Sequence, residues 1–266
     1  MKSHNRSSSS SIGEALAAAC VDDDDALAGR ILTAHPWASA MLVGPMQMTP
    51  LMHAADAGSV ACVKLLLSSG NPLAQDVDGN TALIHAAVSR KSPRQAEVAE
   101  ALAPLSNAGA KNNRGSTALI QAAASSNPKL VAVLAAAAPW GESNLSGQTA
   151  LMLACAVGCS RSANILLGKA DVFAKDAGGK MAFAYAAMGC KIAAGSVVLG
   201  AMINDSRMPA FEDEVSALLE RSIALGWGGL EWSEILLAWR ERRGLLEHLG
   251  AESCPGTQRR LPRPTL

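Results

Sequence analysis

The sequence contains few aromatic residues and no excess of either charge. Phe, Trp and Tyr together make up 3% of the 266 residues, whereas hydrophobic residues make up 49%. The core of a β-sandwich or a β-barrel would require more β-branched and aromatic side chains, so this composition disfavours both folds. Lys plus Arg and Asp plus Glu each number 23. This balance argues against a nucleic-acid-binding protein, because such proteins neutralise phosphates with a basic excess.

Long apolar runs and paired cysteines are also missing. No uninterrupted apolar run reaches the length of about 18 residues that predicts a membrane-spanning helix. The Ser-rich start, MKSHNRSSSSS, lacks the apolar core of a signal peptide, and we expect residues 1–11 to be a disordered tail. The six cysteines include no CxxC pair, so we expect free thiols in a reducing compartment. These features predict a cytoplasmic protein without a membrane segment.

Alanine is abundant and accounts for 51 residues. It has the highest helix propensity and a small side chain, so a core of Ala and Leu favours short helices that approach one another closely.

Five similar segments recur along the chain. They start at residues 49, 81, 117, 149 and 181 and read TPLMHAADAG, TALIHAAVSR, TALIQAAASS, TALMLACAVG and MAFAYAAMGC. A glycine lies two residues before each of the last four segments, and a leucine-rich run precedes that glycine at a fixed distance. Several copies in one register indicate a repeat protein.

The chemistry of one unit predicts two short helices and a tight turn. Gly79 allows a positive φ in the turn, and Thr81 is suited to cap the helix that begins at Ala82. A leucine-rich second helix would follow the alanine-rich first one. One such pair cannot bury its apolar face, but a stack of pairs can, so the repeats predict a helical solenoid.

The TPLxxAA and TALxxAA openings, the Gly-x-Thr turns and the spacing of about 33 residues resemble ankyrin repeats. The resemblance covers roughly residues 12–190. It implies an all-α ankyrin-repeat solenoid of stacked helix-turn-helix units with short finger loops and a C-terminal helical cap. Runs such as GQTALMLACAVG are also similar to the degenerate TALM-type ankyrin repeats of some flagellate protists.

The pattern divides the chain into five regions. After the tail at 1–11, we expect capping helices over 12–48, repeats over 49–192, a helical cap over 193–250 and a flexible Pro/Arg tail over 251–266. In the C-terminal region, two helical patterns span 212–225 and 231–249. The tryptophans Trp227, Trp232 and Trp239 either cap the stack or dock a partner.

The repeats depart from the ankyrin pattern in three respects. The His of the TPLH motif is replaced in every unit, so apolar packing has to take the place of its hydrogen bonds; the residues are Met52, Ile84, Ile120, Met152 and Ala184. Extra residues around 90–94 predict a bulge between the two helices of the second unit. The fifth unit begins with Met181 instead of Thr and lacks a following finger, which indicates the end of the stack.

No catalytic motif is present, and we expect neither enzymatic activity, nor a cofactor, nor a bound metal. HExxH, GxSxG, P-loop and dinucleotide-binding patterns are all absent. His53 and His85 occupy the same position in adjacent units, at about 10 Å separation, which is too far for a shared metal ion without a third ligand. Four consecutive acids, Asp22 to Asp25, are better explained as a turn and a negative helix start than as a cation site.

The resemblance implies that the chain binds another protein through its concave face, formed by the first helices of the units and the finger tips. It places ten candidate residues there: His53, Asp56, Asp78, His85, Lys111, Arg114, Gln121, Leu145, Lys175 and Tyr185. The tips change from acidic on the first finger to basic on the second and fourth. The second tip residue is always Asp or Asn, which we expect to bond its own turn.

We therefore expect a monomeric, non-catalytic scaffold or adaptor for protein–protein interaction. One alternative is an exported effector that engages a host protein through its repeats, suggested by the Ser-rich start. A second alternative is an enzyme with an unrecognised site in residues 193–250, where the only histidine is His248.

Overall fold

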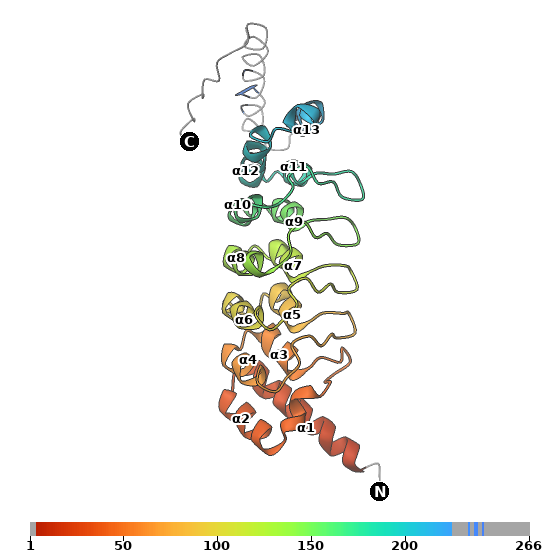
Figure 1. The fold of residues 1–266 in the computed structure, drawn as a ribbon, viewed down its shortest axis with the longest axis vertical. Coiled ribbons are helices and arrows are strands. Elements are labelled where there is room, and N and C mark those ends of the chain that lie inside the picture. The colour runs from red at the N-terminus through yellow and green to blue at the C-terminus, as the bar shows by residue number, and fades with distance from the viewer. Residues whose placement is uncertain (1–3, 225–233, 235–236, 239–240, 242–266) are drawn as a thin grey trace.

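The computed structural model describes residues 4–224 together with 234, 237–238 and 241. Within these residues the chain forms thirteen α-helices and two 3₁₀ helices, and no β-strand. The helices stack in two parallel columns, and hairpin loops project from one side of the stack (Figure 1). The predicted all-α solenoid is thus confirmed.

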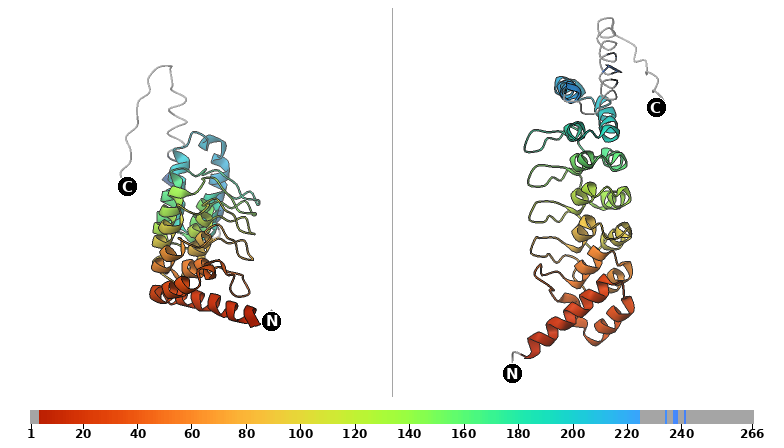
Figure 2. Two further views of the ribbon diagram at one scale, coloured as in Figure 1. Left: turned by 60° about the horizontal axis from the view of Figure 1, so that its bottom comes forward. Right: turned by 180° about the vertical axis from the view of Figure 1, so that it is seen from behind.

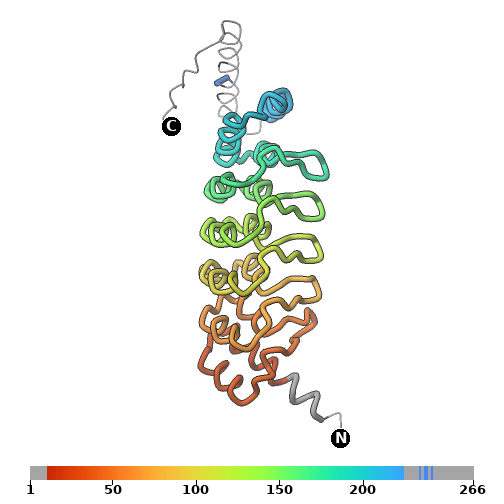
Figure 3. The backbone as a smooth tube through the Cα atoms, in the orientation of Figure 1, coloured from red at the N-terminus to blue at the C-terminus, as the bar shows by residue number. Residues whose placement is uncertain are grey.

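Each repeat contributes one helix to each column. The inner column, next to the loops, contains α3 (Pro50–Ala57), α5 (Ala82–Val88), α7 (Ala118–Ala124), α9 (Ala150–Val157) and α11 (Ala182–Met188). The outer column contains α4 (Val60–Leu66), α6 (Gln95–Leu102), α8 (Pro128–Ala137), α10 (Ser160–Leu167) and α12 (Ile192–Ile203). The backbone trace repeats from unit to unit (Figure 3).

Further helices lie at both ends of the stack. At the N-terminal end, α1 (His4–Val21) packs against α3 and α2 (Asp25–Ala34) against α4, with a 3₁₀ turn, η1 (Pro36–Ala40), after them. At the other end, a 3₁₀ turn, η2 (Met208–Ala210), leads into α13 (Glu212–Ala224), which contacts α11. Both ends of the inner column are therefore covered by a helix.

The first helix is longer than the sequence predicted. It begins at His4, whereas we expected a disordered tail up to residue 11. Leu16 and Cys20 of this helix are fully buried and hold it on the stack. Once a helix is anchored in this way, each further turn adds hydrogen bonds without a new nucleation cost, so the polar residues before Ile12 can extend it.

Threonine hydroxyls cap the inner helices. In Thr49, Thr81, Thr117 and Thr149 the side chain accepts a hydrogen bond from the backbone N–H three residues later. In two units the methionine at the replaced His position contributes as well, because the Sδ atoms of Met52 and Met152 accept the N–H of the capping threonine. Met181 caps α11 without a side-chain bond, as its lack of a hydroxyl predicts.

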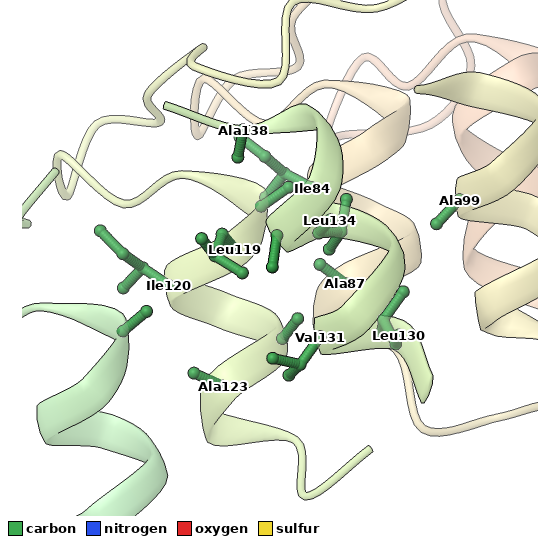
Figure 4. Packing of buried hydrophobic residues seen from close by; sticks show 14 of the residues in the cluster. Ile84, Ala87, Ala99, Leu119, Ile120, Ala123, Leu130, Val131, Leu134 and Ala138 are labelled. Carbon is green, nitrogen blue, oxygen red and sulfur yellow. The ribbon is translucent and has the colours of Figure 1, made fainter. Parts of the chain in front are cut away.

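The core consists of aliphatic side chains between the two columns. Leu119 of α7 faces Val131 and Leu134 of α8 and the neighbouring Ile84, whereas Ile120 points to the opposite side of α7 (Figure 4). All five are at most 4% exposed. Small residues such as Ala87 and Ala123, both fully buried, let the backbones approach closely. Burial of each Leu or Ile stabilises the fold by about 1.5–3 kcal/mol.

The extra residues of the second unit form the predicted bulge. The connection between α5 and α6 spans 89–94, whereas the corresponding turn of the first unit spans only 58–59. The bulge folds back along the stack: Ser89 donates a hydrogen bond to the carbonyl of Asp56, and Arg94 pairs with Asp23 near α2. It also reaches forward, since Arg90 donates to the carbonyl of Ala124. Three units are thereby connected.

The fifth unit ends without a finger. After α12 the chain turns through η2, and the Phe211 ring before α13 stacks on Phe173 at a centroid distance of 4.4 Å. The guanidinium of Arg207 also lies over the Phe173 ring, 4.9 Å from its centre. The predicted helix at 231–249 and the three C-terminal tryptophans lie outside the described residues, apart from 234, 237–238 and 241.

Candidate functional site

Four tight fingers connect each outer helix to the next inner helix. In every finger the N–H of the second tip residue donates to a carbonyl four residues later, at 3.0–3.1 Å. The donors are Asp76, Asn112, Asn144 and Asp176. Their side chains also accept N–H groups of their own turn: Oδ1 of Asn144, for example, accepts from Ser146 at 3.0 Å and from Gln148 at 2.9 Å. The predicted turn role of these residues is confirmed.

The fingers are also bonded to one another. The third tip residue of each finger donates its N–H to a carbonyl of the preceding loop; the pairs are Val77 to Met46, Asn113 to Asp78, Leu145 to Arg114 and Ala177 to Ser146, at 2.9–3.1 Å. The fingers consequently lie in a regular row (Figure 2). The first acceptor, Met46, belongs to a short bridged turn between Val43 and Met48. This turn was not predicted, although Gly44-Pro45 signals it.

The inner helices and the fingers form the two walls of the concave face, because the fingers project from the inner column (Figure 2). Five half-buried side chains at equivalent positions line the helical wall: His53, His85, Gln121, Leu153 and Tyr185.

Two of these side chains are bonded to the fingers. His85 lies with Nε2 2.8 Å from Oδ2 of Asp76. The hydroxyl of Tyr185 donates to Oδ2 of Asp176 and accepts from Nε2 of Gln148 at 2.8 Å. These bonds fix the angle between finger and helix in the second and the fifth unit.

The pKa values of Asp176, Tyr185 and His53 are shifted by their surroundings. The bond from Tyr185 holds the pKa of the Asp176 carboxyl below its usual value. Burial, and then the Asp176 carboxylate, raise the pKa of Tyr185. The pKa of His53 is lowered mainly by burial and then by the neighbouring His85. Nε2 of His53 is buried without a hydrogen-bond partner among the described residues, so His53 is held neutral.

Three charged candidates are engaged in ion pairs within the chain. Lys111 pairs with Glu142 at 2.7 Å and Lys175 with Glu214 at 2.8 Å. Asp56 is paired with Lys91 of the bulge. Within the described part of the chain, Asp78 and Arg114 have no ion pair, and both are exposed. Among the charged candidates on the fingers, Asp78 and Arg114 are therefore the two that still carry the predicted change from acidic to basic.

An open groove of about 470 Å³ lies between the second and third fingers and the inner helices. It brings together three of the ten candidates, Arg114, Gln121 and Leu145. Its other lining residues were not among the candidates: Asn113, Ser116, Asn144, Ser146, Gln148 and Leu153. Their positions relative to the finger glycines would have identified them. The other seven candidates do not line this groove.

The described residues contain no cluster of three or more His, Cys, Asp or Glu side chains that could hold a metal ion. Among the same residues, none of the helices combines the length and the apolarity that crossing a membrane requires. Asp24 caps α2 by accepting the N–H of Leu27 at 2.8 Å, which confirms the predicted structural role of the acidic run.

Comparisons with known proteins agree with this geometry. A family model described as ankyrin repeats (3 copies) matches residues 16–113 and, in a second match, residues 91–176. Among solved structures, the chain is similar to an ankyrin repeat domain from Acinetobacter baumannii, with a TM-score of 0.60 and 23% identity. The match covers 70% of this chain and 96% of that one. No curated protein matches the sequence.

Proposed function

Because this chain belongs to the ankyrin-repeat proteins, we propose that it is a non-catalytic scaffold that binds a partner protein through its concave face. Ankyrin repeats are in general modules for protein–protein interaction. The proposal assigns that role to the inner-helix side chains and finger tips, with the groove at Arg114, Gln121 and Leu145 as its centre.

The observation that carries the proposal is the exposure of Leu145. This side chain is 78% exposed at the rim of the groove. Its backbone is held by a bond to the preceding finger, so the side chain is presented on a rigid support. Covering an exposed leucine releases about 25 cal/mol for each Å² of apolar surface removed from water, and a rigid residue loses little conformational freedom on binding.

Affinity capture with matched surface variants tests this role. The first variant combines Arg114→Ala, Gln121→Ala and Leu145→Ala on the concave face. The control variant combines Lys64→Ala, Glu100→Ala and Lys129→Ala, which are exposed positions on the outer helices. Both variants and the wild type are used as bait in lysate from the native cell, and captured proteins are quantified by mass spectrometry.

We expect at least one protein to be captured by the wild type and by the control variant but not by the concave-face variant. Truncating a central interface residue costs about 2 kcal/mol or more at a hot spot, so three truncations abolish capture. Equal capture by all three baits would contradict the proposal. Circular dichroism at 222 nm establishes beforehand that both variants are folded.

A further inference from the structure

We propose that the groove between the second and third fingers recognises an acidic side chain of the partner protein that is flanked by an aliphatic residue. Arg114 binds the carboxylate, and Leu145 and Leu153 contact the aliphatic neighbour. This inference rests on the proposed function and adds the chemistry of the bound segment.

The charge of the groove favours a carboxylate. Arg114 is the only charged residue among the nine that line the groove. Lys111 and Lys175 are neutralised by Glu142 and Glu214, whereas the Arg114 guanidinium has no ion-pair partner in the described part of the chain. A guanidinium offers two parallel N–H donors that match the two oxygens of a carboxylate. The groove therefore presents one unneutralised cation to a partner.

The backbone around Arg114 is fixed before binding. Its N–H donates to Oδ1 of Asn112 at 3.0 Å, and its carbonyl accepts the N–H of Leu145 at 3.0 Å. The second of these bonds also holds Arg114 and Leu145 side by side on neighbouring fingers. A cation and an aliphatic side chain on a fixed backbone bind with a smaller entropy cost than the same groups on a flexible loop.

A free amide lies on the floor of the groove. The side chain of Gln148 bonds to Asn144 and Tyr185, so its amide is occupied. The side-chain amide of Gln121 makes no hydrogen bond to another described residue and is half-buried. It is free to donate to a carboxylate or to a backbone carbonyl of a bound segment.

Apolar contact is available next to these polar groups. Leu145 is 78% exposed on the rim, and Leu153 is half-buried on the floor. An aliphatic residue beside the acidic one would cover both leucines. On the preceding finger, the exposed Asp78 carboxylate would repel the acidic side chain of the partner. This repulsion keeps that side chain next to Arg114.

A random peptide library tests the chemistry directly. Twelve-residue peptides displayed on phage are selected on the full-length wild type, on Arg114→Glu and on the control Lys129→Glu, which adds the same charge at an exposed position of α8. We expect the wild type and the control to enrich peptides with Asp or Glu next to Leu, Ile, Val or Met. We expect Arg114→Glu to select basic peptides instead.

The best peptide is then synthesised and its affinity measured by fluorescence polarisation. We expect Arg114→Glu and Leu145→Ser each to weaken binding by about tenfold or more, and affinity to fall as salt screens the charge pair. The inference is overturned if acidic residues are not enriched, if no peptide is enriched, or if Arg114→Glu binds the peptide within about twofold of the wild type.

Further variants separate failure of this inference from failure of the proposed function. If Arg114→Glu has no effect but Val77→Ser or His85→Ala abolishes binding, the concave face binds the peptide with another chemistry and only the present inference fails. If none of these substitutions affects a bound peptide, the concave face is not the binding surface and both fail.

Discussion

At the scale of single residues, the second tip residue of a finger is charged or neutral according to the inner-helix side chain that it meets. It is Asp in the fingers whose tip side chain bonds an inner-helix residue, with Asp76 against His85 and Asp176 against Tyr185. It is Asn where the equivalent helix residue is Gln121 or Leu153. A carboxylate between finger and helix needs donors that compensate its lost hydration. The neutral amides bond within the fingers instead, Asn112 to Asn80 of the preceding finger and Asn144 to Gln148 of its own turn.

The half-buried imidazole of His53 makes stability depend on pH. Its pKa lies below the usual value of about 6.5 in the folded protein and returns to that value on unfolding. Below about pH 6.5 the unfolded chain therefore binds more protons than the folded chain, and stability falls as the pH is lowered. We expect His53→Gln to lose less thermal stability than the wild type between pH 7.5 and pH 5.5.

Thermal unfolding followed by circular dichroism at both pH values measures this difference. Gln occupies the equivalent position 121, so the substitution suits the inner-helix surface. Identical losses of melting temperature in wild type and variant would show that His53 does not contribute.

At the scale of elements, the fingers and helices depend on single positions that admit few side chains. Gly147 has φ +74° and lies against the next finger: a Cβ there would be 2.8 Å from the backbone N of Ala177. Gly179 of the last finger has φ +75°, but a Cβ would meet nothing within 4 Å. Both glycines have the same left-handed backbone, but only Gly147 has a further finger packed against it.

We expect Gly147→Ala to destabilise the protein more than Gly179→Ala. Both pay about 1–2 kcal/mol for the left-handed conformation, and Gly147→Ala adds about 1–3 kcal/mol because the backbone of the next finger has to move. Urea unfolding of the two variants measures the difference. Equal free energies of unfolding would mean that the fingers can separate at no cost.

The threonine caps define the start of the inner helices. Thr117 accepts the N–H of Ile120 and is 2% exposed. We expect Thr117→Ala to lower the free energy of unfolding by about 0.5–2 kcal/mol. Thr33→Ala removes an exposed hydroxyl that bonds within α2 and is the matched control, with an expected change within about 0.5 kcal/mol. A comparable loss in both variants would indicate that the cap has no special role.

At the scale of the whole molecule, the stack is held by contacts between neighbouring units. Neighbouring inner helices contact one another along the column, and α1 contacts α3 at one end while α13 contacts α11 at the other. The bulge at 89–94 is an exception, since it connects three units. In a structure of this kind, stability is close to a sum of unit and interface terms, and the ends open first.

We expect Phe211→Ala to loosen the C-terminal end alone. The substitution removes the stacking of Phe211 on Phe173 and with it about 0.5–1.5 kcal/mol beyond the loss of buried area. Hydrogen exchange measured by mass spectrometry should be faster in α11 to α13 and unchanged in α5 and α7. Faster exchange throughout the chain would instead show that the stack unfolds as one cooperative unit.

The sequence by itself determined the repeat architecture, because the signals are local and periodic. Gly79, Thr81 and the following Ala-rich run describe a turn, a cap and a helix within a few residues of one another, and five copies in one register leave little choice of fold. The turn role of Asn144 and its equivalents was predictable for the same reason, since its side chain bonds backbone groups two and four residues away.

Only the tertiary structure decided which candidate residues remain free to bind. Lys111 and Arg114 are exposed basic residues of the same finger. Lys111 pairs with Glu142 of the next unit, whereas Arg114 has no ion pair within the described residues. Likewise, the hydroxyl of Tyr185 is taken by Asp176 and Gln148, while Leu145 is left exposed beside Arg114. These differences arise between side chains about one repeat apart, where small differences in length and direction decide whether two groups meet, and periodicity alone does not specify them.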